Sequence, residues 1–535
     1  MTRKQYFLLY FISAVFFSIL TLILREPGYM DAEYYYAGGI QIAAGNWKTE
    51  PYIWNYLNGP VSLPTVSFSY WMPFSSLLAA AGMKILGSTG FYSARLFFVL
   101  LAGVIPVLAA WFAQEFYPVK GAGWLAGCAA IFSVYYLPYL INIDSFTPLM
   151  LMGGIFIFSA YQINLAVKNE KPEKRWIFLL GLVTGLIHLT RADGAIWFVV
   201  GVAVLFNVWK HWGRGKRAVK PLIFSVIIFA FGYLLIMAGW YIRNLIVFQS
   251  IMPPGNGHLI WATDYDDLFF YNAQTISPDR FWASGLGEIL FDRVSALWNN
   301  VKSLLGVNGS IILVPFIAMG IWRTRKHFIT QLTLVISAIV LLVMSLVFPY
   351  AGYRGGYFHS NSAIQVIFWG LVPIGLQGFI DLGVKYRKWI PNRSWKMFGA
   401  AIIATVTVLS VVIFIQKVNQ PISSDSGWNG TLNEYKILDE EIIRRTGDED
   451  SVIMVNDPPG YYLAANRMAI VNPSDGIQEL LTAADQFGAR FVILTQDNRL
   501  LRNDLDQDKN SQDRLKLLFK LGSSEIYEIY DTKEN

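Results

Sequence analysis

Two carboxylates lie two positions apart, at Asp31 and Glu33, directly after the first long apolar run of the sequence. Acids beside a membrane-length apolar segment are costly to desolvate, so they are normally functional. Residues two apart share a face of an extended chain but diverge on a helix. If 32–44 forms a helix, Asp31 could also be its N-cap, which does not exclude catalysis. We predict that Asp31 and Glu33 are catalytic.

A third acid, Asp144, lies in the polar segment Asn142–Ser145 between two apolar runs. One interpretation makes it the N-cap of the following helix, with Pro148 in the first turn. The other places it across a cleft from Asp31, where it would orient an acceptor or hold a metal. Together, Glu33 and Asp144 could bind a divalent cation through hard carboxylate oxygens.

Polar residues also interrupt apolar sequence at His188–Gly194, which contains Arg191 and Asp193. A hairpin turn between two membrane segments would explain this composition. Charged groups at membrane depth also tend to face a cavity or bind an anion. Arg191 is therefore a candidate phosphate or carboxylate contact, and Asp193 a candidate acceptor or metal contact.

Three further basic residues could bind a phosphate. Arg243 follows a Trp-Tyr pair, where it is either an interfacial anchor or a phosphate contact. Arg354 and His359 lie in a Gly-containing loop predicted between two apolar runs. Glycines let a backbone approach a ligand closely, and both side chains can donate hydrogen bonds to phosphate oxygens.

The composition indicates a polytopic membrane protein. The 535 residues are 54% hydrophobic and 15% charged, and the mean hydropathy is +0.41, whereas soluble domains are roughly 25% charged. The net charge of +6 is spread over short connections, which argues against a nucleic-acid partner. The single cysteine excludes an intramolecular disulfide. The sequence also lacks the phosphate loop of ATPases, the His-Glu-x-x-His motif and the Gly-x-Ser-x-Gly motif.

Eleven segments are long and apolar enough to predict an all-α membrane bundle. They begin near Gln5, Arg95, Gly121, Phe146, Trp176, Gly194, Pro221, Gly309, Phe328, Ser362 and Phe398. Basic residues recur on alternate connections, at 3–4, 120, 168–175, 210–220, 323–326 and 385–396. By the positive-inside rule these connections are cytoplasmic, as is the N-terminus. The candidate acids and arginines then face outward.

The chain divides into two predicted domains, 1–417 in the membrane and 418–535 outside it. Within the first, the outer loops 25–90 and 243–308 are long, and the stretch 70–86 is amphipathic enough to lie along the interface. Residues 431–445 and 476–487 are predicted helices, while 451–456 and 490–495 are predicted strands. The second domain is therefore a small extracytoplasmic α/β domain. Its segment 456–462 is either a binding loop or an ordinary turn.

Several motifs resemble those of the GT-C superfamily of integral-membrane glycosyltransferases, especially the protein O-mannosyltransferase, aminoarabinose transferase and rhizobial galacturonosyltransferase-like group. They are Asp31–Tyr35, Gly59–Pro60, Tyr70–Pro73, Leu189–Gly194 and Trp240–Asn244. Many relatives have adjacent acids in the first outer loop, whereas here Ala32 separates them. The resemblance covers about residues 1–417.

The resemblance implies transfer of a sugar from a polyprenyl-phosphate donor to a hydroxyl acceptor of an envelope glycan, lipid or protein, with inversion. It implies Asp31 as the base and Arg191, Arg243, Arg354 and His359 as contacts to the donor phosphate. Metal use varies among these families, so a divalent cation stays an open alternative. A lipid or sugar transporter is the main rival hypothesis, but it would place polar groups in the middles of the spans. A non-catalytic scaffold is the second.

Overall fold

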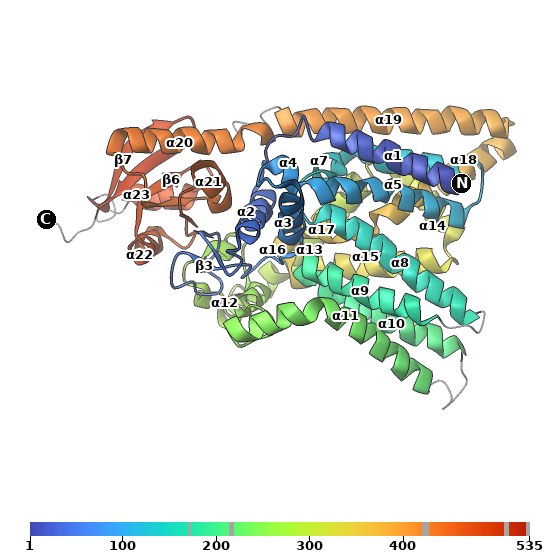
Figure 1. Cartoon of the computed structure of the whole chain (residues 1–535), viewed down its shortest axis with the longest axis horizontal. Coiled ribbons are helices and arrows are strands. Elements are labelled where there is room, and N and C mark those ends of the chain that lie inside the picture. Colours follow the sequence, from blue (N-terminus) through green and yellow to red (C-terminus); the bar gives the residue numbers. More distant parts are fainter. Residues whose placement is uncertain (169–172, 213–218, 420–426, 508–512, 531–535) are drawn as a thin grey trace.

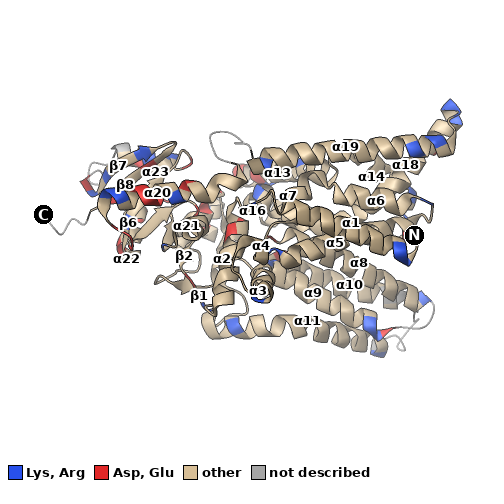
Figure 2. Cartoon of the chain, turned by 45° about the horizontal axis from the view of Figure 1, so that its top comes forward, with Lys and Arg blue, Asp and Glu red and all other residues tan. Residues whose placement is uncertain are grey.

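A computed structural model describes residues 1–168, 173–212, 219–419, 427–507 and 513–530. Long helices form a bundle at one end of the molecule, and a small α/β region forms the other end (Figure 1). The basic residues predicted to mark cytoplasmic connections at 171, 214, 216 and 217 lie outside the described residues. Elsewhere, Lys and Arg gather at the end of the bundle far from the α/β region (Figure 2).

Six helical segments of the described chain are long and apolar enough to cross a membrane, or seven if one bent pair of helices forms a single span. They are Leu96–Phe116, Phe146–Lys168, Lys220–Phe248, Phe328–Val347, Pro349–Arg387 and Pro391–Asn419, with Ala122–Ile131 plus Val134–Leu140 as the bent pair. All seven coincide with predicted segments. The other four predicted segments are also helical, as α1 (Arg3–Leu20), α9 (Lys174–Thr190), α10 (Ala195–Trp212) and α14 (Val314–Thr324). The total of about eleven spans stays a prediction.

The first outer loop contains two helices that pack on each other, α2 (Met30–Ala44) and α3 (Phe74–Leu86). α2 confirms the helix predicted at 32–44 but begins two residues earlier, because Tyr29 is its N-cap. Asp31 is therefore not the cap. Both acids fall in the first helical turn, where the helix dipole favours negative charge.

The α/β region has a six-stranded sheet of order β2-β5-β4-β6-β8-β7. Its strands are β2 (Tyr52–Ile53), β4 (Val452–Val455), β5 (Ala469–Val471), β6 (Ala489–Leu494), β7 (Leu515–Leu521) and β8 (Ser524–Ile529). The first four in this order are parallel, and β8 pairs antiparallel with both β6 and β7. β2 comes from the first outer loop, so this loop completes the sheet of the C-terminal region. The predicted strands at 451–456 and 490–495 are confirmed as β4 and β6.

Helices cover both faces of this sheet. Ile453 of β4 packs with α20 (Thr431–Thr446) and α21 (Pro458–Ala465), whereas Met454 packs with α22 (Ile477–Phe487) and α23 (Arg499–Gln507). The alternation follows from the two-residue period of a strand. α20 and α22 confirm the two helices predicted in the tail.

The predicted Gly-containing loop around Arg354 is helical instead. Residues Gly352–Gly356 form a π-helical turn that continues into α17 (Tyr357–Asn361) and then α18 (Gln365–Arg387). Gly355 has a φ of 132°, a conformation that only glycine adopts readily. Gly355, which permits this kink, is also one of the two glycines that indicated a loop.

Candidate functional site

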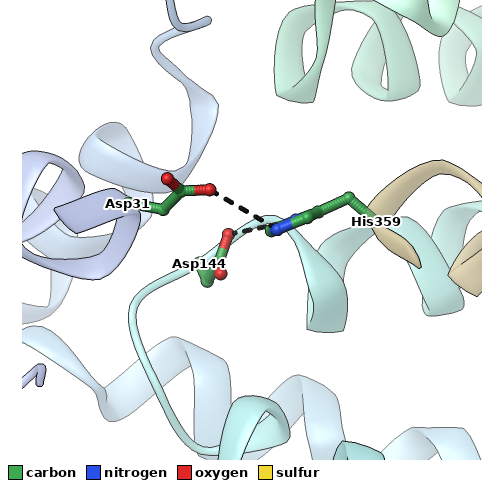
Figure 3. A group of neighbouring side chains, drawn as sticks. All are labelled: Asp31, Asp144 and His359. Carbon is green, nitrogen blue, oxygen red and sulfur yellow. Dashed lines mark ion pairs between the residues drawn. The ribbon is translucent and has the colours of Figure 1, made fainter. Parts of the chain in front are cut away.

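The structure brings Asp31 and Asp144 together around His359 (Figure 3). The Nε2 atom of His359 lies 3.4 Å from Oδ2 of Asp31, and its Nδ1 atom lies 3.6 Å from Oδ1 of Asp144. The three residues come from α2, from the connection between α7 (Leu137–Leu140) and α8 (Phe146–Lys168), and from α17. We call Asp31, Asp144 and His359 the acid–histidine cluster.

Asp144 is fully buried and held from several directions. The hydroxyl of Tyr29 donates to its Oδ2 at 2.6 Å, and the backbone N–H of Ser145 donates to its Oδ1. The Oγ of Ser145 also lies 2.9 Å from Nδ1 of His359, and the imidazole stacks on Phe146 at 4.0 Å between ring centroids. These contacts fix the imidazole and Asp144 in one arrangement.

Asp31 is the more accessible acid, since 28% of its side chain is exposed. Burial raises its pKa to about 7, and the neighbouring Asp144 also raises it, while Arg191 lowers it. Burial likewise raises the pKa of Asp144 to about 6, against the opposing effect of its hydrogen bonds. A carboxylate that titrates near neutral pH and remains accessible is suited to general-base catalysis.

Arg191 and Asp193 lie beside the cluster and bind each other, with Arg191 Nε 2.8 Å from Asp193 Oδ1. Ser360, which follows His359 in the chain, donates its hydroxyl proton to the other oxygen of Asp193. The turn predicted at 188–194 is confirmed, because α9 ends at Thr190 and α10 begins at Ala195. Asp193 therefore anchors Arg191, whose positive charge acts on both acids of the cluster.

The two remaining predicted arginines lie in different surroundings. Arg354 is exposed, stacks over the ring of Tyr265 at 4.8 Å, and forms no salt bridge within the described residues. Tyr265 lies within the electrostatic reach of both Arg354 and Asp31. Arg243 instead donates to the backbone oxygen of Ser67 and to Asn244 Oδ1, so it is bound to the first outer loop.

A cavity of about 250 Å³ is lined by residues between positions 49 and 69 of the first outer loop and by Phe248. Glu50, Trp54, Asn58 and Phe248 are among the residues that line it, and the guanidinium of Arg243 stacks over Phe248. The acid–histidine cluster does not contribute to its lining. The cavity and the cluster are therefore separate features of the molecule.

No family model and no curated protein matches the sequence. Solved structures do match its fold. The crystal structure of ArnT from Cupriavidus metallidurans bound to undecaprenyl phosphate superposes with a TM-score of 0.58 at 12% identity, covering 99% of each chain. The apo state of the same protein gives 0.52 at 13% identity, covering 99% of this chain and 98% of that one. The chain has the GT-C fold.

A second GT-C structure is similar over a smaller share of its length. The oligosaccharyltransferase of Archaeoglobus fulgidus, tethered with an acceptor peptide, gives a TM-score of 0.50 at 12% identity. The match covers 99% of this chain and 75% of that one. At these identities the similarity establishes the fold, and the chemistry must be argued from the residues.

Within this GT-C fold, Glu33 lies away from the acid–histidine cluster. It is fully buried, and its carboxyl group faces that of Asp457, which follows β4. Burial and the charge of Asp457 raise the pKa of Glu33 well above its ordinary value. Two facing buried acids are stable when they share a proton. Glu33 therefore joins α2 to the C-terminal region, and sequence reasoning did not single out Asp457 as its partner.

The surroundings of Gly460 in α21 show that the contact between Glu33 and Asp457 is tightly packed. A methyl group added there would lie 2.6 Å from Asp457 Oδ2 and 2.9 Å from Glu33 Oε2. Although alanine is favoured over glycine in a helix by roughly 1 kcal/mol, overpacking costs about 1–3 kcal/mol. We expect Gly460→Ala to lower the melting temperature of the purified protein.

Gly257→Ala is the control, since nothing lies within 4 Å of a methyl group at that position. Differential scanning fluorimetry in one detergent compares both variants with the wild type. Equal melting of Gly460→Ala and the wild type would contradict the close contact between Glu33 and Asp457.

The acid–histidine cluster could hold a metal ion. Each of its three residues offers one ligand atom, and these atoms lie within 4.8 Å of one another. Two carboxylate oxygens and one imidazole nitrogen suit Zn²⁺ or Mn²⁺. The predicted cation pair was Glu33 and Asp144, but the structure places His359 and Asp31 beside Asp144 instead, with Glu33 directed at Asp457.

Proposed function

We propose that this protein is an integral-membrane glycosyltransferase that moves a sugar from a polyprenyl-phosphate donor to a hydroxyl acceptor, with inversion. One observation carries the proposal: Asp31 and Asp144 converge on His359 in a chain with the GT-C fold. The undecaprenyl phosphate bound by ArnT supports a lipid-linked donor. The sugar is a hexose or a pentose.

In the proposed reaction, the carboxylate of Asp31 takes the proton of the acceptor hydroxyl as its oxygen attacks the anomeric carbon. The new carbon–oxygen bond forms while the bond from that carbon to the phosphate oxygen breaks. Polyprenyl phosphate leaves with the bonding electron pair. Positioned positive charge stabilises the negative charge that develops on a leaving oxygen. Arg191 acts on both acids of the cluster, and Arg354 stacks on Tyr265, which is within electrostatic reach of Asp31.

A divalent cation fits the acid–histidine cluster by its donor set. Asp31, Asp144 and His359 would hold it, and it would supply charge neutralisation and Lewis acidity to an oxygen of the donor or acceptor. Asp144 and Tyr29 keep the cluster oriented in either case. Glu33 holds α2 against Asp457 and so positions Asp31.

The proposed orientation places the cluster and the C-terminal region outside the cytoplasm. Lys and Arg gather at the opposite end of the bundle (Figure 2), which supports a cytoplasmic location for that end and for the N-terminus. The donor's lipid tail would then lie among the spans while its phosphate meets the arginines at the outer interface.

A direct test reconstitutes the purified protein in proteoliposomes with undecaprenyl-phosphate-linked sugars, one hexose and one pentose at a time. Formation of free undecaprenyl phosphate, followed by mass spectrometry, is the expected result with at least one donor and an envelope-lipid extract as acceptor source. Movement of the intact lipid-linked sugar between leaflets without its cleavage would instead favour the transporter hypothesis.

The raised pKa of Asp31 predicts a particular pH dependence. The base must be ionised to accept a proton, and burial raises its pKa to about 7. We expect kcat/KM to fall about tenfold per pH unit below this value and to level off above it. Initial rates measured from about pH 5 to pH 9 test this expectation. A rate that stays constant on acidification to pH 5 would exclude Asp31 as the base.

A further inference from the structure

The carboxyl edge of the parallel strands in the α/β region has the geometry of a ligand site. After β4 the chain crosses through α21 to β5, and after β5 it crosses through α22 to β6, on the other side of β4. α21 and α22 cover opposite faces of the sheet. The order in which the strands are added to the sheet therefore reverses between β4 and β6. In open α/β sheets, ligands bind in the crevice outside such a switch point.

Amide and hydroxyl side chains occupy this edge. Asn456 follows β4, Asn472 follows β5 and Thr495 follows β6. Asn456 Nδ2 donates to Thr495 Oγ1 at 3.0 Å, and Asn456 Oδ1 accepts from Asn472 at 2.9 Å and from Asn498 at 2.8 Å. We call Asn456, Asn472, Thr495 and Asn498 the amide cluster.

The amide cluster retains unused hydrogen-bonding capacity. Asn472 is only 4% exposed, yet its Oδ1 has no partner within the described part of the chain. A buried acceptor without a partner carries a desolvation cost. At the rim, Asp497 is exposed and adds a carboxylate. Within the described residues, the side-chain hydrogen bonds of the four cluster residues involve no Lys or Arg, a composition that suits hydroxyl groups better than phosphate.

The edge also faces the membrane part of the molecule. Asp457, next to Asn456, faces Glu33 near the start of α2. In the loop after β5, Ser474 donates its hydroxyl proton to the backbone oxygen of Asp266 at 2.6 Å. The carboxylates of Asp266 and Asp497 lie within electrostatic reach of each other, and Arg354 acts on Asp266 as well. The amide cluster, Arg354 and Asp31 thus lie along the boundary between the α/β region and the membrane part of the molecule.

We propose that the amide cluster is a binding subsite for the hydroxyl groups of a saccharide, and that it presents a carbohydrate portion of the acceptor to Asp31. The amides supply both donors and acceptors, and the Asp497 carboxylate accepts from a hydroxyl. Saccharide binding by this cluster is independent of catalysis, whereas its role as an acceptor subsite rests on the proposed function.

Saturation-transfer difference NMR on the full-length protein in lipid nanodiscs tests the subsite, with methyl α-mannoside and methyl β-galactoside as probes. Saturation of the ring protons of at least one glycoside is expected for the wild type. We expect binding about three- to tenfold weaker in Asp497→Ala and in Asn498→Ala, the range that lost hydrogen bonds produce. Asp497 is exposed, so its replacement leaves the fold intact.

The matched control is Asp450→Ala. Asp450 is also exposed but precedes β4, at the opposite edge of the same sheet, and its replacement is expected to leave binding unchanged. Absence of binding to both glycosides, equal binding by Asp497→Ala and the wild type, or an equal loss in Asp450→Ala would each overturn the subsite. Asp31→Asn is expected to keep saccharide binding, which separates failure of this inference from failure of the proposed transferase.

Discussion

Asp31→Asn is expected to lower sugar transfer from polyprenyl phosphate by about 10²- to 10⁴-fold, the contribution of a positioned general base. Asparagine has nearly the same shape but cannot take the proton of an acceptor hydroxyl. The variant also removes one of the two acids beside His359. Its fold is expected to persist, because the acid is partly exposed and its loss relieves repulsion with Asp144. Single-turnover release of undecaprenyl phosphate is the measurement.

Asp279→Asn is the matched control for this experiment. Asp279 also lies in the first turn of an outer helix, α12 (Pro278–Ala283), and is exposed. Asp279 lies outside the acid–histidine cluster, so the turnover of Asp279→Asn is expected to equal that of the wild type. Wild-type turnover in Asp31→Asn would remove Asp31 from the role of base.

Arg191→Gln is expected to reduce turnover at pH 7 by about 10²- to 10³-fold, as happens when one preorganised charge stabiliser is removed. Arg191 lowers the pKa of both Asp31 and Asp144. Without its charge both pKa values rise, so less Asp31 is ionised at neutral pH. Part of the lost activity should therefore return as the pH is raised. Complete pH–rate profiles of the two proteins measure this displacement.

Two further variants separate charge from structure. Arg191→Lys keeps the positive charge, so its profile should stay close to that of the wild type. Arg323→Gln breaks another Arg–Asp pair, with Asp381 at 2.5 Å, but at an exposed position on a predicted cytoplasmic connection. Its profile is expected to be unchanged. An Arg191→Gln profile with the wild-type midpoint would show that Arg191 does not act through the acids.

Local patterns in the sequence predicted the turn at Arg191, and they offered the helix after Asp31 as an alternative, in which Asp31 and Glu33 diverge. These features depend on helical periodicity and on polar interruptions of apolar runs, which neighbouring residues determine. The six helices that are long and apolar enough to cross a membrane were predicted for the same reason. The amphipathic stretch at 70–86 likewise contains helix α3 (Phe74–Leu86).

Long-range pairings were beyond such patterns. The sequence could not show that His359 lies between Asp31 and Asp144, or that Asp457 faces Glu33, because packing of distant segments decides both contacts. Strand β2 has two residues, too few for a periodic signal, so its place in the C-terminal sheet was not predicted. The segment around Arg354 contains two glycines, which indicated a loop although its backbone is helical.

A structure of the protein with undecaprenyl phosphate tests the central claim most directly, since that claim is a donor bound beside the acid–histidine cluster. We expect the phosphate group within hydrogen-bond distance, roughly 3 Å, of Arg354 or Arg191, with the anomeric position directed toward Asp31. A phosphate bound at Arg243, away from Asp31, would contradict a donor site beside the acid–histidine cluster.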